Sequence, residues 1–278
     1  MTQLTGLIGY PISHSLSPAI HAYWLREYGI DGAYKLFTTQ PPRLRQTMLH
    51  MRKKKAVGLN ITIPHKQAVI PYLDGIDDLA RRVGAVNTIT AKNGKLFGTN
   101  TDVYGFITNL RSGLSGQLER SLDHVVILGA GGATRAAIIA LQEAGAKKIT
   151  LLNRTLTSAE ALAQQFSVHV SPWETRNSVI GGASLLVNTT CLGMHGQPAL
   201  DLDLKQMDPT CAVHDIVYAP LETKLLAYAR QRKQPTVDGL GMLLYQAQAA
   251  FYSWHQVMPA ITPELRALLS NPTLELAP

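Results

Sequence analysis

The sequence predicts a two-domain α/β fold, and three observations support this prediction. Short β-branched runs alternate with helical patterns through the first hundred residues, as they do in a sheet covered by helices. A second alternation of strand and helix begins near His124. The chain has 278 residues, 46% of them hydrophobic and 16% charged, which is enough apolar material for two buried cores.

The N-terminal domain is expected to be α/β with a mainly parallel sheet. Its first helix has clear signals, because Ser17 is a natural N-cap, Pro18 suits the first helical position and Gly29 would end the helix. A hairpin is expected over Lys92–Lys95, which contains Asn-Gly. The strands are predicted by the β-rich runs at 5–10, 33–37, 56–63 and 85–90.

A helix that begins near Asp102 and fades after Arg111 leads into the second domain. In that domain, whose sheet should be parallel, we expect strands at 183–188, 212–217 and 235–237 and a helix at 221–231. The helix from Gly241 is too apolar to lie free on this domain, so we expect it to return to the first. The predicted domains are 1–103 with 240–278, and 104–239.

The most informative segment is His124–Arg135, where an apolar strand runs into glycines that open an alanine-rich helix. This layout presents backbone N–H groups to a pyrophosphate. Thr134 departs from the usual fingerprint, since it stands where the third glycine would be. Strand, glycines, helix and second strand still follow in order within about thirty residues, as a Rossmann dinucleotide-binding unit requires. The candidate cofactor-binding residues are Gly129, Ala130, Gly131, Gly132 and Ala133.

The second strand of this unit ends in Asn153-Arg154-Thr155. An NAD-binding domain would place an acid here for the ribose 2′-hydroxyl, whereas a cation favours a 2′-phosphate. The three residues are therefore candidates for binding NADP. NAD remains the weaker alternative.

Net charge and the positions of cysteine and histidine bear on whether the protein binds nucleic acid or a metal ion. The formal charge is +7, and Arg43, Arg45 and Arg52–Lys55 are concentrated in one helical stretch and the turn after it. Such cations could attract nucleic acid, but a solvated helix end that suits the helix dipole is the favoured interpretation. The two cysteines do not have metal-ligand spacing, and no histidine pair does either. We expect no metal and no nucleic-acid partner.

The chain lacks a basic segment followed by a long apolar core at its start, and no run of about eighteen apolar residues occurs. We therefore expect a cytoplasmic protein that does not bind a membrane. Cysteine usage fits a reducing compartment.

Polar clusters follow the predicted strands of the first domain. Ser15 and Ser17 lie beside a helix start that suits a carboxylate; for Ser17 capping is an equal interpretation, while for Ser15 ligand contact is favoured. Asn60 and Thr62 alternate onto one face of a strand. Lys66 is expected in the first turn of a helix, a poor place for a cation, and an exposed lysine is an equal interpretation.

Two further candidates lie near the domain junction. Asp102 has the alternative role of N-cap of the connecting helix, and Asn87 could be a turn residue.

Seven segments together resemble the successive signatures of the shikimate dehydrogenase family, in the family's order and over nearly the whole chain. They are Pro11–Pro18, Asn60–Lys66, Gly84–Thr88, Asn100–Asp102, Gly129–Ala133, Asn153–Thr155 and Asp238–Met242. The resemblance implies reversible, NADPH-dependent reduction of 3-dehydroshikimate to shikimate. The resemblance does not fix the oligomeric state, and a homodimer is one possibility.

The resemblance also implies residue roles. Lys66 and Asp102 would form the catalytic pair, and this makes physical sense because reduction of a carbonyl leaves an alkoxide that needs a cationic proton donor. Gly239 would join the cofactor site. The substrate carboxylate would be held by Ser15, Ser17 and Tyr218, and the ring hydroxyls by Asn60, Thr62, Asn87, Asp102 and Gln246.

One departure from the family keeps a second interpretation open. NADP-specific members often carry a further basic residue three positions after Asn-Arg-Thr, where this chain has Ser158. A quinate/shikimate dehydrogenase that accepts NAD is therefore the nearest alternative. A non-catalytic ligand sensor is more remote, since the intact Lys66 and Asp102 argue against it.

Overall fold

The computed structural model describes residues 3–270, which divide into two compact units. Unit 1 comprises residues 3–101 and 246–270, and unit 2 comprises residues 102–245. The chain crosses between them after Thr101 and again within helix α9 (Gly239–His255).

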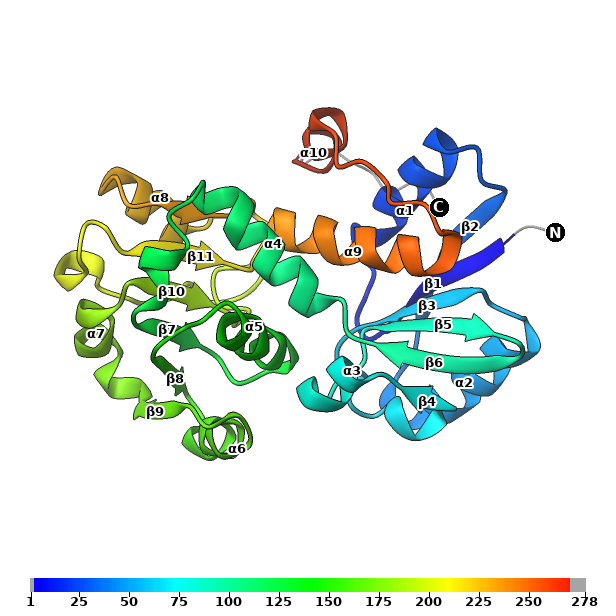
Figure 1. Cartoon of the computed structure of the whole chain (residues 1–278), viewed down its shortest axis with the longest axis horizontal. Helices are drawn as coiled ribbons and strands as arrows, with labels where there is room; N and C mark the ends of the chain where they lie inside the picture. The colour runs from blue at the N-terminus through cyan, green and yellow to red at the C-terminus, as the bar shows by residue number, and fades with distance from the viewer. Residues whose placement is uncertain (1–2, 271–278) are drawn as a thin grey trace. The chain divides into compact units, whose positions relative to one another are not determined.

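The sheet of unit 1 has the strand order β2-β1-β3-β5-β6-β4 (Figure 1). Five strands run in one direction and only β5 is antiparallel to its neighbours, which confirms the mainly parallel sheet. Asn93 (φ 52°) and Gly94 (φ 74°) form the predicted hairpin turn, since a two-residue type I′ turn needs positive φ at both positions. The strands are β1 (Gln3–Gly9), β2 (Gly32–Thr38), β3 (Gly58–Ile61), β4 (Gly75–Ile76), β5 (Thr88–Lys92) and β6 (Lys95–Thr99).

One face of this sheet is covered by the amphipathic helix α2 (Leu44–Lys53) and by α3 (Asp78–Val83). Successive strand residues point to opposite faces, so Leu59 and Ile61 of β3 lie on this side. The basic residues beside α2 are mostly exposed, and Arg52 forms an ion pair with Asp74. The core on this face consists of Ile8, Leu44, Met48, Met51, Ala56, Leu59, Ile61, Val69, Ala80, Val86, Ile89 and Leu96.

The other face carries α1 (Ser17–Glu27) and the C-terminal part of α9, with α10 (Pro263–Ser270) against α1. Trp254 of α9 lies directly on Gly58, where a Cβ atom would overlap the indole ring. The indole nitrogen donates a hydrogen bond to Ile89 O at 3.0 Å. The expectation that the C-terminal helix returns to the first domain is confirmed.

The start of α1 corrects the sequence prediction. The N-cap is Leu16 rather than Ser17, and Pro18 is the second helical residue. The helix begins one residue early because the Ser15 hydroxyl accepts the Ser17 N–H at 3.2 Å. The Ser17 hydroxyl bonds to Tyr34 instead. The helix ends as predicted, with Gly29 at φ 62° just beyond it.

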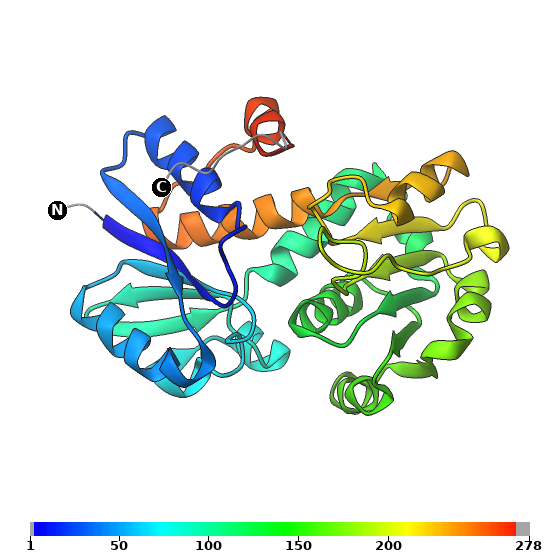
Figure 2. The same ribbon diagram turned by 180° about the vertical axis from the view of Figure 1, so that it is seen from behind.

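Unit 2 contains a fully parallel sheet in the order β12-β11-β10-β7-β8-β9, the doubly wound Rossmann arrangement (Figures 1 and 2). The predicted parallel sheet is confirmed. Strand β9 was not predicted, because its half-exposed residues lack an apolar run. The strands are β7 (Val125–Leu128), β8 (Ile149–Asn153), β9 (His169–Pro172), β10 (Leu185–Asn188), β11 (Ala212–Asp215) and β12 (Thr236–Val237).

Helices lie on both faces of this sheet. On one face, Val213 of β11 belongs to a core shared with Leu226 of α8. Its neighbour His214 points to the opposite face, where it contacts Phe106 and Asn109 of α4. The helices of unit 2 are α4 (Asp102–Leu114), α5 (Gly132–Glu143), α6 (Leu156–Phe166), α7 (Arg176–Val179) and α8 (Lys224–Gln231), followed by the start of α9.

His21 of α1 gives unit 1 a dependence on pH. The ring is 1% exposed, stacks on Tyr34 at 4.1 Å and lies near Trp254. Burial, with a smaller contribution from the neighbouring His255, lowers the pKa of His21 to about 3. Between this value and the ordinary 6.5, the unfolded chain binds a proton on His21 that the native state excludes. Native stability is therefore lost as pH falls through this range.

We predict that His21→Phe reduces acid destabilisation of unit 1. The wild-type contribution should decrease by about 1.4 kcal/mol for each pH unit below the ordinary pKa. Urea unfolding followed by tryptophan fluorescence at about pH 7 and pH 5 measures it, because Trp24 and Trp254 adjoin the ring. Substitution of the exposed His50 by Gln is the control. Equal pH dependence of wild type and His21→Phe would refute the prediction.

Candidate functional site

The polar residues of unit 1 that the sequence singled out gather at one edge of its sheet. Strands β1, β3 and β6 end at this edge and the antiparallel β5 begins there, since Ile8 pairs with Ile61, and Thr88 pairs with both Asn60 and Thr99. The segments containing Ser15, Thr62, Asn87 and Thr101 all follow or precede these strand ends. Open α/β sheets bind ligands at this kind of edge.

Asn60 and Ser17 are linked through Tyr34, a residue that the sequence analysis missed. The Tyr34 hydroxyl donates to Asn60 Oδ1 at 2.8 Å and is also bonded to the Ser17 hydroxyl. Burial raises the pKa of Tyr34 well above its usual value, so the phenol remains a neutral donor. A tyrosine within a strand has no motif of its own, and no sequence signal distinguished Tyr34 from a core residue.

Asn60 is 5% exposed, and its amide hydrogens are already engaged. Nδ2 donates to Asn87 O and to Thr88 Oγ1, both at 3.2 Å. A lone pair of Oδ1 therefore remains as the hydrogen-bonding capacity that Asn60 can offer a ligand.

Asn87 is the centre of a second group of hydrogen bonds and is 2% exposed. Its Oδ1 accepts the Thr101 N–H at 2.7 Å and the Thr88 hydroxyl at 3.1 Å. Its Nδ2 donates to Thr101 Oγ1 at 3.0 Å and to Gln246 Oε1 at 3.4 Å. The structure thus brings Asn87 and Gln246 together, although they are 159 positions apart in the chain.

Lys66 corrects the sequence prediction, because it lies in a series of turns and not in the first turn of an α-helix. Its carbonyl accepts the Val86 N–H at 2.7 Å and so does not continue a helix. His65, beside it, is buried and its ring bonds to Thr39 O at 2.6 Å. Lys66 and Thr62 are both partly exposed. A 3-10 turn at Ile70–Tyr72 follows.

Asp102 is the first residue of α4 and is 5% exposed. The residue before it, Thr101, is held by Asn87 through both its N–H and its hydroxyl. A carboxylate in the first turn of a helix is favoured by the helix dipole. The predicted helix start near Asp102 is therefore confirmed, with Asp102 as the first helical residue rather than the N-cap.

In unit 2 the predicted glycine turn connects β7 to α5. Gly129 has φ 113°, a conformation that favours glycine, and Gly131 is the N-cap of α5. Gly131 is exposed, and a Cβ atom placed on it would meet open space. Gly132 and Ala133 occupy the first turn of α5, where helix N–H groups have no intrahelical acceptor. These residues fit the pyrophosphate of a dinucleotide.

Asn153, Arg154 and Thr155 lie at the end of β8, which is adjacent to β7. Asn153 Nδ2 donates to Thr155 O at 2.8 Å, which closes the turn that carries Arg154. The Arg154 side chain is exposed. Because neighbouring parallel strands end at the same edge, the segment that carries Arg154 follows β8 at the edge where the glycine turn follows β7, which fits a phosphorylated ribose.

The remaining predicted residues of unit 2 follow β11 and β12. Tyr218 is partly exposed, and burial raises its pKa. Gly239 begins α9, and a Cβ atom there would overlap the carbonyl of Ile216, so close backbone packing requires glycine at this position. Gly241 has the same requirement, because a Cβ atom there would overlap the side-chain amide of Asn109. Packing alone accounts for these two glycines.

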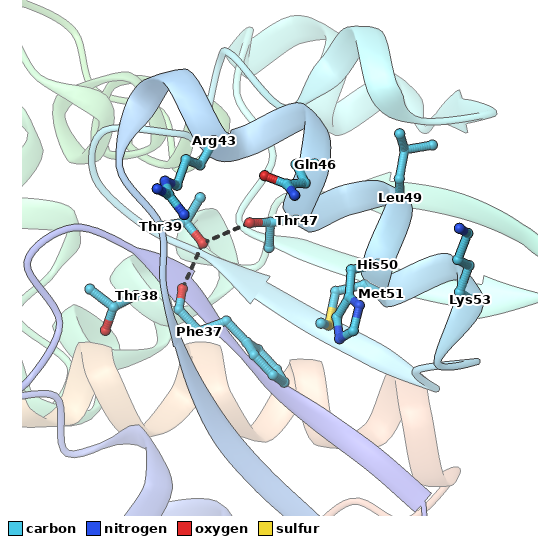
Figure 3. A pocket seen from close by; sticks show the side chains of 10 residues that line it. All are labelled: Phe37, Thr38, Thr39, Arg43, Gln46, Thr47, Leu49, His50, Met51 and Lys53. Atoms are coloured by element: carbon cyan, nitrogen blue, oxygen red, sulfur yellow. Dashed lines mark hydrogen bonds between the residues drawn. The ribbon is translucent and has the colours of Figure 1, made fainter.

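A cavity of about 510 Å³ lies between β2 and α2 in unit 1 (Figure 3). Arg43, His50 and Lys53 line it, and Thr39 bonds to Thr47 at 3.2 Å in its wall. It contains none of the residues that the sequence analysis assigned to a site.

Within residues 3–270, no helix is long and apolar enough to cross a membrane. The same part of the chain has no cluster of three or more histidine, cysteine or acidic residues that could hold a metal ion.

Two family models match the chain. Residues 7–89 match the shikimate dehydrogenase substrate binding domain, and residues 115–192 match shikimate / quinate 5-dehydrogenase.

Known proteins of the same kind match over nearly the full length. A shikimate dehydrogenase (NADP(+)) from Paramagnetospirillum magneticum is 46% identical over 270 residues, 96% of this chain and 98% of that protein. Shikimate 5-dehydrogenase from Thermus thermophilus, solved with NADP(H) and shikimate, has TM-score 0.85 and 35% identity, covering 97% and 98% of the two chains. Quinate dehydrogenase from Corynebacterium glutamicum, solved with NAD, has TM-score 0.90 and 32% identity, covering 97% and 99%. The chain therefore belongs to the shikimate dehydrogenase family of oxidoreductases.

Proposed function

We propose that this protein catalyses the reversible, NADPH-dependent reduction of 3-dehydroshikimate to shikimate. The observation that carries the proposal is the polar network of Asn60, Asn87 and Gln246 at the ligand-binding edge of unit 1, within a chain of this family. In this proposal most of the substrate-binding residues belong to unit 1, and the cofactor-binding residues belong to unit 2. The match of residues 7–89 to the shikimate dehydrogenase substrate binding domain supports the first assignment, and the Thermus thermophilus relative was solved with both NADP(H) and shikimate.

The substrate is a ring that carries hydroxyls and one carboxylate, and the proposed binding residues match both kinds of group. Ring hydroxyls are bound by Asn60, Thr62, Asn87, Asp102 and Gln246. Since the Nδ2 hydrogens of Asn60 are engaged, Asn60 accepts a hydrogen bond from a ring hydroxyl through Oδ1.

The carboxylate is bound by Ser15 and Ser17 beside the start of α1, with Tyr218 as a further donor. Hydroxyl groups near a helix N-terminus suit an anion, because the first-turn N–H groups lack intrahelical acceptors.

The proton transfer is assigned to Lys66 and Asp102. When bound, NADPH supplies the hydride. The Lys66 ammonium gives its proton to the carbonyl oxygen as negative charge develops there, and recovers it from the hydroxyl in the reverse direction. The Asp102 carboxylate keeps the lysine charged and oriented. Val86 binds the Lys66 carbonyl, and the next residue, Asn87, holds Thr101, so adjacent residues fix the backbone of both segments.

NADP is held in this proposal by the glycine turn and by Asn153, Arg154 and Thr155, with Gly239 nearby in the cofactor site. The open space at Gly131, the first turn of α5 and the exposed guanidinium of Arg154 fit a pyrophosphate and a 2′-phosphate.

A quinate/shikimate dehydrogenase that uses NAD is the second candidate. Two observations favour it: Ser158 stands where a second cation would be, and the quinate dehydrogenase solved with NAD has a TM-score of 0.90. A steady-state matrix of shikimate and quinate against NADP and NAD tests the choice. We expect the highest kcat/KM with shikimate and NADP, and a higher value with quinate and NAD would reverse the assignment.

We predict that Lys66→Ala lowers kcat by about two orders of magnitude or more while KM for shikimate changes much less, because the ammonium acts mainly as the alkoxide forms. The exposed Lys54→Ala is the matched control. Asp102→Asn should also lower kcat, and its effect should not add to that of Lys66→Ala. A Lys66→Ala enzyme with wild-type kcat would exclude the catalytic pair.

We predict that Arg154→Ala raises KM for NADP far more than KM for NAD. A guanidinium pairs with the 2′-phosphate, which NAD lacks. Steady-state kinetics with both cofactors provide the measurement, with the exposed Arg111→Ala as control. Equal changes for the two cofactors would show that Arg154 does not bind the phosphate.

We predict that Ser15→Ala raises KM for shikimate by a factor corresponding to one charge-assisted hydrogen bond, roughly 1.5 to 3 kcal/mol. It should also lower the free energy of unfolding by about 1 kcal/mol, since Ser15 accepts the Ser17 N–H at the start of α1. The exposed Ser13→Ala, in the same loop, should change neither quantity. A Ser15→Ala protein that loses stability but keeps its KM would leave Ser15 with a structural role only.

A further inference from the structure

Thr134 occupies the position at which the dinucleotide fingerprint usually has its third glycine. It is the third helical residue of α5, and its side chain is fully buried. The third glycine normally allows close packing between helix and strand. Here a side chain fills that space, so the packing must be satisfied in a different way.

The Thr134 hydroxyl is part of a continuous chain of hydrogen bonds. Gly131 N–H donates to Thr134 Oγ1 at 3.0 Å, and Thr134 Oγ1 lies 2.8 Å from Thr189 Oγ1. Thr189 Oγ1 donates to Leu128 O at 2.7 Å. A hydroxyl has one proton, and Thr189 gives its own to Leu128. Thr134 must therefore donate to Thr189, which leaves Thr134 free to accept from Gly131.

This chain of bonds joins the glycine turn to two strands. Leu128 is the last residue of β7, and Thr189 directly follows β10, the neighbouring strand. Gly129 fits between them closely, since a Cβ atom on it would be 2.6 Å from Thr189 Oγ1. The sheet order reverses between β7 and β10, which is where doubly wound folds bind ligands.

The bond from Gly131 to Thr134 also sets the start of α5. An N3 side chain that accepts the N–H of the N-cap residue satisfies a donor that the helix leaves open. With the Gly131 N–H turned toward Thr134, the N–H groups of Gly132 and Ala133 in the first turn remain for an anion.

We propose that Thr134 and Thr189 are positioning residues that hold the pyrophosphate-binding turn in its binding conformation before the cofactor arrives. The inference rests on the proposed function only in taking the ligand to be a dinucleotide. A turn that is already ordered loses less conformational freedom on binding, so the pair raises affinity without touching the ribose. Loss of the Thr134 hydroxyl therefore weakens NADP and NAD by the same factor, unlike loss of Arg154, which weakens NADP selectively.

The test measures two properties of the whole protein without substrate: hydrogen exchange of the Gly131 amide by NMR, and the dissociation constants of NADP and NAD by calorimetry. We expect Thr134→Val to accelerate Gly131 exchange and to raise both dissociation constants about tenfold, the loss of one hydrogen bond. Thr134→Ser keeps the hydroxyl and should restore both properties. Thr189→Val should weaken binding too, with an effect that does not add to that of Thr134→Val.

Thr150→Val is the matched control for a buried threonine in the same sheet. Thr150 is 3% exposed and its hydroxyl bonds to His124 Nε2 at 3.0 Å, away from the turn. The Thr150→Val substitution should leave Gly131 exchange and both dissociation constants unchanged.

If Thr134→Val accelerates exchange without changing either dissociation constant, the hydroxyl is only a helix cap and the inference is wrong. It is also wrong if NADP alone is weakened. A wild-type chain that binds both dinucleotides but does not reduce 3-dehydroshikimate would overturn the proposed function and leave this inference intact.

Discussion

The buried amide of Asn87 is the interaction on which the candidate substrate site depends. A buried amide that lacks hydrogen-bond partners is costly, so its environment must supply them. Asn87 obtains them from Thr88 of β5, from Thr101 after β6 and from Gln246 of α9. One side chain thereby links the strand ends to α9 within unit 1. Asn60 extends the network to Tyr34.

In unit 2 a buried carboxylate at the sheet edge likewise obtains hydrogen-bond partners from the surrounding loops. Asp215, at the end of β11, accepts hydrogen bonds from Asn188 Nδ2, the Val217 N–H and the Thr223 hydroxyl. Burial raises the pKa of Asp215, although these three bonds favour its charged form. Thr223 in turn caps α8 through the Leu226 N–H. The loops after β10 and β11, which include Thr189 and Tyr218, are therefore tied to one side chain.

The two units thus share a feature: polar side chains at strand ends are hydrogen-bonded within the protein itself. Asn60 has a lone pair left after its amide hydrogens are engaged, and Thr134 uses its hydroxyl within the glycine turn. Side chains held in this way lose little freedom on binding, which favours affinity and the orientation needed for reaction. The exposed Arg154 differs, since Asn153 fixes the turn that carries it while the Arg154 side chain itself faces solvent.

The sequence alone predicted much of the fold, because the relevant signals are local. Strand and helix periodicity gave the two α/β sheets, Asn93-Gly94 gave the hairpin, and the glycine turn after β7 gave the dinucleotide-binding unit. The motif residues also identified the family, since their order along the chain is a property of sequence alone.

Contacts between distant segments could not be predicted in this way. The role of Tyr34 depends on its side chain reaching Asn60 of β3, although β1 lies between β2 and β3. Lys66 does not continue a helix because its carbonyl binds the Val86 N–H. Ser15 decided where α1 starts, because it accepts the Ser17 N–H. The buried hydroxyl of Thr134 depends on its hydrogen-bond partner Thr189, which is 55 positions away in the chain. Tertiary structure decided these features, because a hydrogen bond between distant residues exists only after the chain has brought its donor and acceptor together.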